Sequence, residues 1–297
     1  MAEEAANLRV GPAGWSYDDW EGIVYPSHKP KGFDPLAYLA EYFDVIEINS
    51  TFYRAPAPRA AASWVRRTAG NPRFKFTLKL HQKFTHERRG ITAEDEEAFR
   101  AGIEPIVEAG KLGCVLVQFP WSFKYFPENS LYLKRLVERF KEYPLVLEVR
   151  NASWDTEVVF QLLAERGVGF CNIDQPRFRG QLGATEVATS PVGYVRLHGQ
   201  NVESWFKQDQ PAHERYNYYY SMDELAPWVE RIRAVAAQAK ETYVITNNHY
   251  QGQAVANALQ LKFLAGDECI PTPLAMHDRF PELKTISTTQ APQERLF

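Results

Sequence analysis

Polar or charged side chains end a series of short apolar segments along this 297-residue chain. They are of the kinds that bind anions and move protons, and in chain order they are Glu47, Asn49, Lys79, His81, Gln118, Glu148, Arg150, Asp174, Arg196, His198, Asn247 and His249. Carboxylates and imidazoles act as general acids and bases, whereas arginine and lysine hold phosphates. The sequence therefore predicts one site of mixed charge, if the fold brings these segment ends together.

The apolar segments themselves have the length and alternation of β-strands. They cover residues 8–13, 44–51, 73–81, 114–120, 145–150, 168–174, 193–198 and 242–249. Between most of them the apolar period changes to that of a helix, and Ser221 with Glu224 forms a capping box before one such stripe. Alternating strands and helices of this length favour a parallel sheet with crossover helices.

We therefore predict a single (β/α)8 TIM barrel over residues 8–266, with long βα loops at 83–92 and 199–221. No helical stripe lies between Asp174 and Pro191, so this link is expected to be a loop. Residues 267–297 are expected to form a C-terminal tail with a poorly ordered end. In a TIM barrel the carboxyl ends of the strands carry the site.

Strand parity predicts which side chains face the barrel axis. In residues 145–150, Glu148 and Arg150 share a face opposite Leu147 and Val149. The uniformly apolar row should contact the helices, which leaves the mixed row facing inward. The sixth segment is harder to phase, because Asp174 shares its parity with apolar residues.

Buried charges must be paired or solvated, because an isolated buried charge costs several kcal/mol. One interpretation is a self-satisfied network in which Lys79, Arg150 and Arg196 neutralise Glu47, Glu148 and Asp174. The favoured interpretation is a pocket for an anionic ligand, because loop cations make the mouth more positive. These loop cations are Arg54, Lys83, Arg88 and Arg177.

Aromatic residues also follow the strand ends, and they include Trp15, Tyr17, Tyr53, Trp154 and Trp205. Flat aromatic rings stack on sugars and nucleobases, although packing under a loop is the alternative for any one of them.

Composition excludes several classes of protein. A net charge of −3 argues against a wholly basic nucleic-acid-binding surface. The three scattered cysteines support neither a disulfide framework nor a structural zinc site. Residues 1–8 are polar and acidic, and no apolar run could span a membrane, so we expect a cytoplasmic protein without a membrane partner.

Ordered motifs connect the chain to a known family. They include Gly11-Pro-Ala-Gly-Trp-Ser-Tyr, Glu47-Ile-Asn-Ser-Thr-Phe-Tyr, Glu148-Val-Arg and Tyr194-Val-Arg-Leu-His-Gly. With these motifs the chain resembles the YecE-like family, domain of unknown function 72, from about Val10 to Leu264. The resemblance implies a (β/α)8 barrel and specifies no reaction.

The preferred hypothesis is metal-free acid–base chemistry on a phosphorylated sugar or nucleotide-type ligand, without a cofactor. Lys79, Arg150 and Arg196 would hold the anion. Glu47 or Glu148 would move protons with His198, and Asp174 is a further catalytic candidate. The remaining candidates would bind substrate: Trp15, Tyr17, Asn49, Tyr53, His81, Gln118, Trp154, Asn247 and His249.

Two alternatives stay open. A metal-dependent hydrolase or isomerase, resembling apurinic endonuclease or xylose isomerase barrels, would use carboxylate and imidazole ligands. Its ligands would be Glu47, His81, Glu148, Asp174, His198 and His249. A non-catalytic nucleic-acid-binding protein would use the same cations and the aromatic rim. Glycoside hydrolysis is disfavoured, because Glu47 and Glu148 are predicted on strands across the barrel from each other.

Overall fold

Eight parallel strands form the framework of the protein, which a computed structural model describes for residues 8–203, 212–266 and 268–288. Every segment expected to be a strand is one, with slightly different ends. The strands are β1 (Leu8–Pro12), β2 (Val45–Ile48), β3 (Lys75–Lys79), β4 (Leu112–Gln118), β5 (Leu145–Glu148), β6 (Gly169–Asp174), β7 (Val192–Leu197) and β8 (Glu241–Thr246). Hydrogen bonds join them in the order β1-β8-β7-β6-β5-β4-β3-β2.

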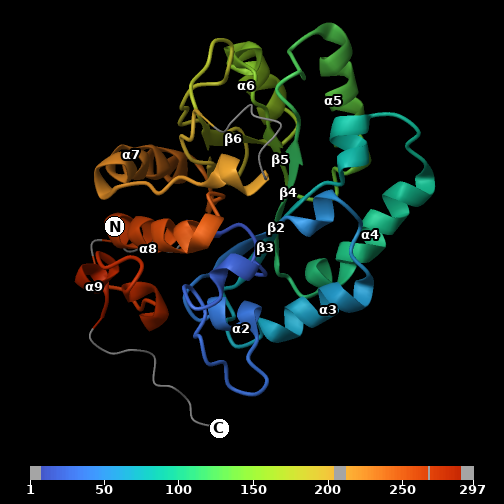
Figure 1. Ribbon diagram of the computed structural model, residues 1–297. Helices are drawn as coiled ribbons and strands as arrows, with labels where there is room; N and C mark the ends of the chain where they lie inside the picture. The colour runs from blue at the N-terminus through green and yellow to red at the C-terminus, as the bar shows by residue number, and fades with distance from the viewer. Residues whose placement is uncertain (1–7, 204–211, 267, 289–297) are drawn as a thin grey trace.

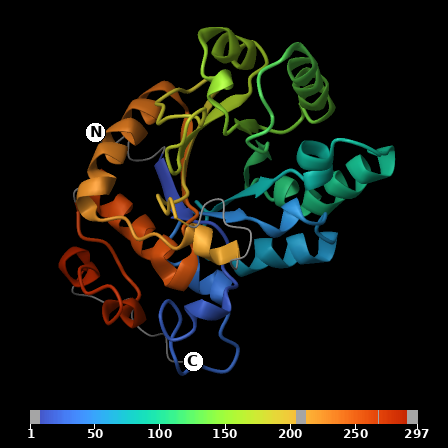
Figure 2. The same ribbon diagram turned by 45° about the horizontal axis from the view of Figure 1, so that its top comes forward.

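Helices follow most of the strands and surround them (Figures 1 and 2). They are α2 (Pro35–Leu39), α3 (Pro58–Arg67), α4 (Ala93–Glu108), α5 (Pro127–Arg139), α6 (Glu157–Ala164), α7 (Met222–Gln238) and α8 (Gln253–Gly266). The predicted capping box is present at the start of α7, where the Ser221 and Glu224 side chains bond each other's backbone amides. This alternation confirms the single (β/α)8 TIM barrel with long βα loops.

Short helical turns follow several strands at their carboxyl ends, where the predicted site residues lie. They are η1 (Asp18–Trp20), η2 (Ser50–Phe52), η3 (Lys83–Glu87), η4 (Ala152–Trp154), η5 (Ala212–Tyr216) and η6 (Tyr250–Gly252). Each of these turns lies between a strand and the outer helix that follows it.

The barrel closes between β1 and β2, the two ends of the hydrogen-bonded order. A single parallel bridge joins Ala13 to Glu47, and the amide of Gly14 donates to the carbonyl of Glu47 over 2.9 Å. The approach is so close that a Cβ at Gly11 would overlap the carbonyl oxygen of Val45. Glycine at this position therefore allows the two edge strands to meet.

The link between β6 and β7 replaces an outer helix with an irregular segment. All of residues 175–191 are described and none is helical, as the sequence predicted. The side chain of Asn172 on β6 bonds the carbonyl and the amide of Val187, over 2.9 Å and 2.8 Å. The outer face of β6 is therefore divided: Phe170 packs on Phe160 of α6, whereas Asn172, further along the strand, satisfies loop backbone.

Beyond α8 the chain folds back on the barrel. Residues 268–288 include η7 (Leu274–His277) and α9 (Leu283–Ile286), and the side chains of Met276, Leu283 and Ile286 are buried. This part of the predicted tail packs against α8. Residues 289–297, the end expected to be poorly ordered, lie outside the described residues. None of the described helices combines the length and apolarity needed to cross a membrane.

Candidate functional site

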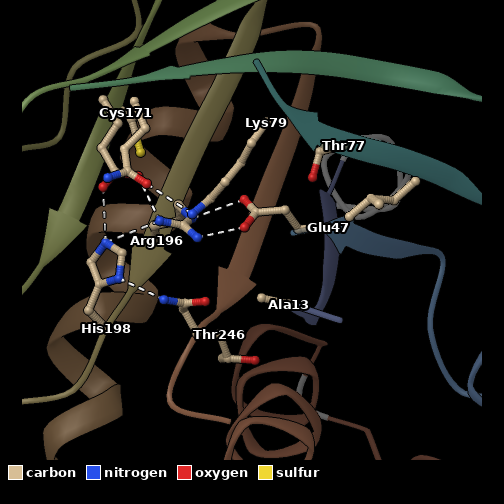
Figure 3. A network of polar contacts seen from close by, with 12 residues as sticks. Ala13, Glu47, Thr77, Lys79, Cys171, Arg196, His198 and Thr246 are labelled. Atoms are coloured by element: carbon tan, nitrogen blue, oxygen red, sulfur yellow. Dashed lines mark hydrogen bonds and ion pairs between the residues drawn. The ribbon is translucent and has the colours of Figure 1, made fainter. Parts of the chain in front are cut away.

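Arg196 lies at the centre of a buried ion cluster on the barrel axis. Its Nη2 and Nε atoms approach Glu47 Oε1 and Oε2 at 2.5 Å and 2.9 Å, and Nη1 donates to Glu148 Oε2 over 2.8 Å. The three side chains come from β7, β2 and β5, and none of them is exposed. Figure 3 shows Arg196 and Glu47 joined across the barrel. One guanidinium therefore bonds two carboxylates in a fork geometry that suits arginine.

Glu47 has further partners on the side of the strands' amino ends. The hydroxyl of Tyr194 donates to Glu47 Oε2 over 2.8 Å and lies 2.9 Å from Thr77 Oγ1. Below it, the ring of Tyr243 fills the space beside Gly113, where a Cβ would lie 2.8 Å from the ring. These bonds fix the Glu47 carboxylate as a buried counterion of Arg196.

Glu148 is shared between two arginines. Arg150 Nη2 donates to Glu148 Oε1 over 2.8 Å, while Arg196 holds the other oxygen. Although burial raises the pKa of the Glu148 carboxyl, the charges of Arg196 and Arg150 hold it well below its usual range. Glu148 is therefore a carboxylate at neutral pH.

His198 lies beside the two arginines that bond Glu148. Its Nε2 atom is 3.2 Å from Arg150 Nη2 and 3.4 Å from Arg196 Nη1, and its Nδ1 atom is 3.1 Å from Asn247 Nδ2. Burial lowers the pKa of His198 to about 3, and the charge of Arg150 adds to the shift. The imidazole is therefore neutral near pH 7 and has no extra proton to donate.

Lys79 and Arg150 are the cations nearest the open end of the cluster. The Arg150 side chain is 13% exposed, and Lys79 is partly exposed, whereas Arg196 is not exposed at all. Lys79 Nζ donates to Gln118 Oε1 over 2.9 Å and lies 5.3 Å from the centre of the Phe52 ring. Burial lowers the pKa of the Lys79 amine to about 8, and the charge of Arg196 lowers it further.

His86 belongs to the same region, although it is not among the site residues predicted from the sequence. It packs edge-on against Phe52, with ring centres 4.9 Å apart. Burial lowers the pKa of His86 to about 4, assisted by the charges of Lys79 and Arg150. The signal that could have identified it is its position in the loop directly after β3.

Asp174 does not join the cluster. On β6 it has the parity of Asn172 and faces outward, where the hydroxyl of Tyr220 and Nε2 of Gln200 donate to its carboxylate, the latter over 2.6 Å. Burial raises the pKa of Asp174 to about 6, against the lowering effect of these two hydrogen bonds. It lines a cavity of about 230 Å³ with Arg177 among other residues.

Trp154 also lies away from the mouth. Its ring is fully buried and stacks on Phe123, whose carbonyl accepts a 2.6 Å hydrogen bond from the indole N–H. Trp154 therefore has the alternative role considered for these aromatic residues, packing under a loop. No face of its indole is left for a substrate. Trp205 lies outside the described residues.

The other candidates surround the strand ends singly. Tyr17 stacks on His249 with ring centres 4.5 Å apart, and its hydroxyl donates to the carbonyl of Ala13 over 2.9 Å. Trp15 packs edge-on against Trp64. Asn49 Oδ1 is buried without a hydrogen-bond partner among the described residues.

Tyr53 is 68% exposed, and its carbonyl lies 3.1 Å from His81 Nε2. It is the most exposed of the predicted aromatic residues that the structure describes.

The residues proposed as metal ligands are not grouped as a metal would require. Glu47 and Glu148 are bound to arginines, and Asp174 faces outward. Within the described ranges, no group of three or more His, Cys, Asp and Glu side chains could hold a metal ion. In this part of the chain the residues present do not fit the metal-dependent hypothesis.

The sequence of this barrel matches a known protein family. A family model described as protein of unknown function DUF72 matches residues 9–278. The chain belongs to the DUF72 family. The YecE-like resemblance drawn from the motifs is thereby confirmed.

One curated protein and two solved structures match most of the chain. UPF0759 protein YunF of Bacillus subtilis (strain 168) is 29% identical over 268 residues, which are 86% of this chain and 93% of YunF. A solved DUF72 family protein from Thermotoga maritima is 36% identical with a TM-score of 0.75, covering 87% of this chain and 99% of that one. One from Enterococcus faecalis is 26% identical with a TM-score of 0.76, covering 87% and 95%. These names state a family and no reaction.

Proposed function

We propose that the open end of the barrel binds a small anionic ligand, such as a phosphorylated sugar or nucleotide-type molecule, at Lys79 and Arg150. The observation that carries this proposal is the unequal depth of the charges. Glu47 and Glu148 are fully buried and already bound to Arg196, whereas the side chains of Lys79 and Arg150 are partly exposed.

The charge balance supports an anion at this end. Three cations face two carboxylates in the cluster, and the neighbouring His198 is neutral. The pKa of His86 is lowered by burial and then by Lys79 and Arg150, as a positive local potential requires. A phosphate group would complete the balance, and the planar guanidinium of Arg150 matches its geometry.

The proton-transfer part of the proposal is placed on Lys79. An effective acid–base group has a pKa near the working pH. The amine of Lys79, with a pKa of about 8, meets this condition, whereas Glu148 and His198 have pKa values far below it. In this proposal Glu47 and Glu148 orient Arg196, and their ion pairs with it reduce its attraction for the ligand.

Intrinsic tryptophan fluorescence can test the proposal by titration with pyrophosphate, glycerol phosphate and AMP at low and high potassium chloride. We expect saturable binding of at least one of these anions that weakens with salt. Arg150→Gln should weaken it by about tenfold or more, since charge-assisted hydrogen bonds contribute about 1.5–3 kcal/mol. The matched control is Arg66→Gln, an exposed arginine on α3, which should bind as the wild type does.

Two results would overturn the proposal. One is the absence of anion binding by the wild-type protein. The other is equal binding by the Arg150→Gln and wild-type proteins. A single-stranded oligonucleotide is titrated in parallel. If it binds far more tightly than the mononucleotide, with a steep dependence on salt, the nucleic-acid-binding alternative replaces the small-ligand proposal.

A further inference from the structure

Lys79 differs from the other cations of the cluster in its partners. Arg196 and Arg150 each bond a carboxylate, whereas the Lys79 amine bonds the neutral amide oxygen of Gln118 over 2.9 Å. No ion pair of Lys79 with a carboxylate is found among the described residues. The amine is therefore not held in its charged form by a salt bridge there.

The backbone of Lys79 is fixed by a residue outside its strand. The hydroxyl of Thr51, in η2, donates to the carbonyl of Lys79 over 2.8 Å and lies 3.1 Å from its amide nitrogen. The ring of Phe52, in the same turn, lies 5.3 Å from the amine. Contacts to both its backbone and its amine therefore hold Lys79 in place, which a reacting group requires.

The charges around the amine favour its neutral form. Burial has the largest effect on its pKa, followed by the charge of Arg196. The charged or titratable groups facing it come from four elements or the loops that follow them, and they are Arg196 from β7, Glu47 from β2, Glu148 and Arg150 at the end of β5, and His86 from η3. With a pKa of about 8, about a quarter of the amine is neutral near pH 7.5, against about one in a thousand for an ordinary lysine.

We propose that Lys79 is a nucleophile that captures the carbonyl carbon of an anionic aldehyde or ketone as an imine, while Arg150 binds the anionic group. This inference rests on the proposed function, and it narrows the ligand class to phosphorylated or carboxylated carbonyl compounds. The inference depends on the position of Lys79. Its amine lies at the carboxyl end of a barrel strand and has no salt bridge among the described residues.

The step balances without an added oxidant or reductant. The lone pair of the neutral amine forms the C–N bond, and the carbonyl electron pair moves to oxygen, which is protonated. The resulting carbinolamine loses water, so the carbonyl oxygen leaves with two hydrogens that balance the two lost by the amine, and a C=N bond remains. Protonation of this imine places a positive charge where it withdraws electrons from the neighbouring carbon of the ligand.

Pyridoxal phosphate is a suitable probe, because it carries an aldehyde and a phosphate. The wild-type protein is incubated with it, reduced with borohydride and mapped by peptide mass spectrometry. We expect labelling of Lys79 near neutral pH at least about tenfold faster than that of the exposed Lys134 in the same sample. The rate at Lys79 should level off above about pH 8, whereas that at Lys134 should keep rising.

The variants separate chemistry from structure. Lys79→Arg should lose the label at this position while retaining a positive charge, and Lys134→Arg should leave the labelling of Lys79 unchanged. Pyridoxal without phosphate should label Lys79 more slowly than pyridoxal phosphate does. Because the wild-type comparison uses two lysines of one folded protein, it holds even if a variant misfolds.

Pyridoxine phosphate distinguishes this inference from the function on which it rests, because it has an alcohol in place of the aldehyde. If it binds but Lys79 is labelled no faster than Lys134, the nucleophile is overturned and the anion site stands. If pyridoxine phosphate and the other phosphates fail to bind, the anion site itself is overturned. Fast labelling of Lys79 together with binding supports both.

Discussion

At the scale of single residues, the site depends on which charges have partners. Arg196 has two carboxylates, Arg150 shares one of them, and Lys79 bonds an amide oxygen. A buried ion pair contributes little net stability, but removal of one partner leaves an uncompensated charge. The buried pairs therefore fix the geometry of the cluster. The cations nearest the open end are the groups that can contact a ligand.

Asp174 provides a prediction at this scale. Its pKa is about 6 in the folded protein and 3.8 in the reference state. Between these values the folded protein keeps a proton that the unfolded chain has released, so the contribution of Asp174 to stability is highest below about pH 4 and falls until about pH 6. At about 1.36 kcal/mol per unit, the loss is about 3 kcal/mol. Asp174→Asn should remove this part of the pH dependence, as measured by urea unfolding from pH 4 to pH 7.

Asp155→Asn is the control for that experiment, because Asp155 is exposed at the surface. Its profile should follow that of the wild type. If Asp174→Asn also runs parallel to the wild type across this range, the carboxyl is not desolvated in the way its surroundings indicate.

At the scale of elements, the closure of the barrel depends on how closely β1 approaches β2. The two strands share a single bridge, and the same Glu47 that forms it carries the side chain bound to Arg196. The position of the cluster is therefore coupled to the spacing of the two edge strands. A separation of the two strands would disturb Glu47 on β2, one of the two carboxylates that bond Arg196.

Gly11→Ala tests this coupling. The added methyl group would overlap the backbone of Val45, so the strands must separate, and we expect a loss of about 2 kcal/mol or more in the free energy of unfolding. Gly70→Ala is the matched control, because a Cβ there meets open space and should change stability by less than about 1 kcal/mol. Equal effects of the two substitutions in urea unfolding would show that β1 and β2 do not meet as described.

At the scale of the whole molecule, the chain after α8 is part of the packed structure. Within residues 268–288, Ile270 bridges to Ser287, and Leu283 is fully buried against the barrel's outer layer. The family model extends to residue 278, so it includes the beginning of this segment. We infer that residues 268–288 unfold together with the barrel.

Leu283→Ala tests this inference. Truncation of a buried leucine costs about 2–5 kcal/mol, and a loss in this range is expected in thermal or urea unfolding. Leu274→Ala provides a control in the same segment, because Leu274 is 60% exposed and its truncation should change stability by less than about 0.5 kcal/mol. A loss at Leu283 as small as that at Leu274 would mean that the segment folds independently of the barrel.

The sequence by itself determined the architecture of this protein. Alternation within the strands, helical stripes between them and the absence of a stripe before Pro191 are local patterns, and each was confirmed at its place in the chain. The inward faces of β2, β5 and β7 also followed from parity. The inward residues Glu47, Glu148 and Arg196 were therefore known as a group before their contacts were.

The tertiary structure decided which members of that group are partners. Arg196 and Glu47 are separated by 149 positions, and their contact depends on strand stagger and on closure between β1 and β2. The partners of Asp174 likewise come from remote loops, because Gln200 and Tyr220 donate to its carboxylate on the outer side of β6. Local periodicity determines which face a side chain occupies. Ion pairing and desolvation depend on distances between remote segments. The lowered pKa of Lys79 therefore follows from the tertiary structure and not from the local sequence.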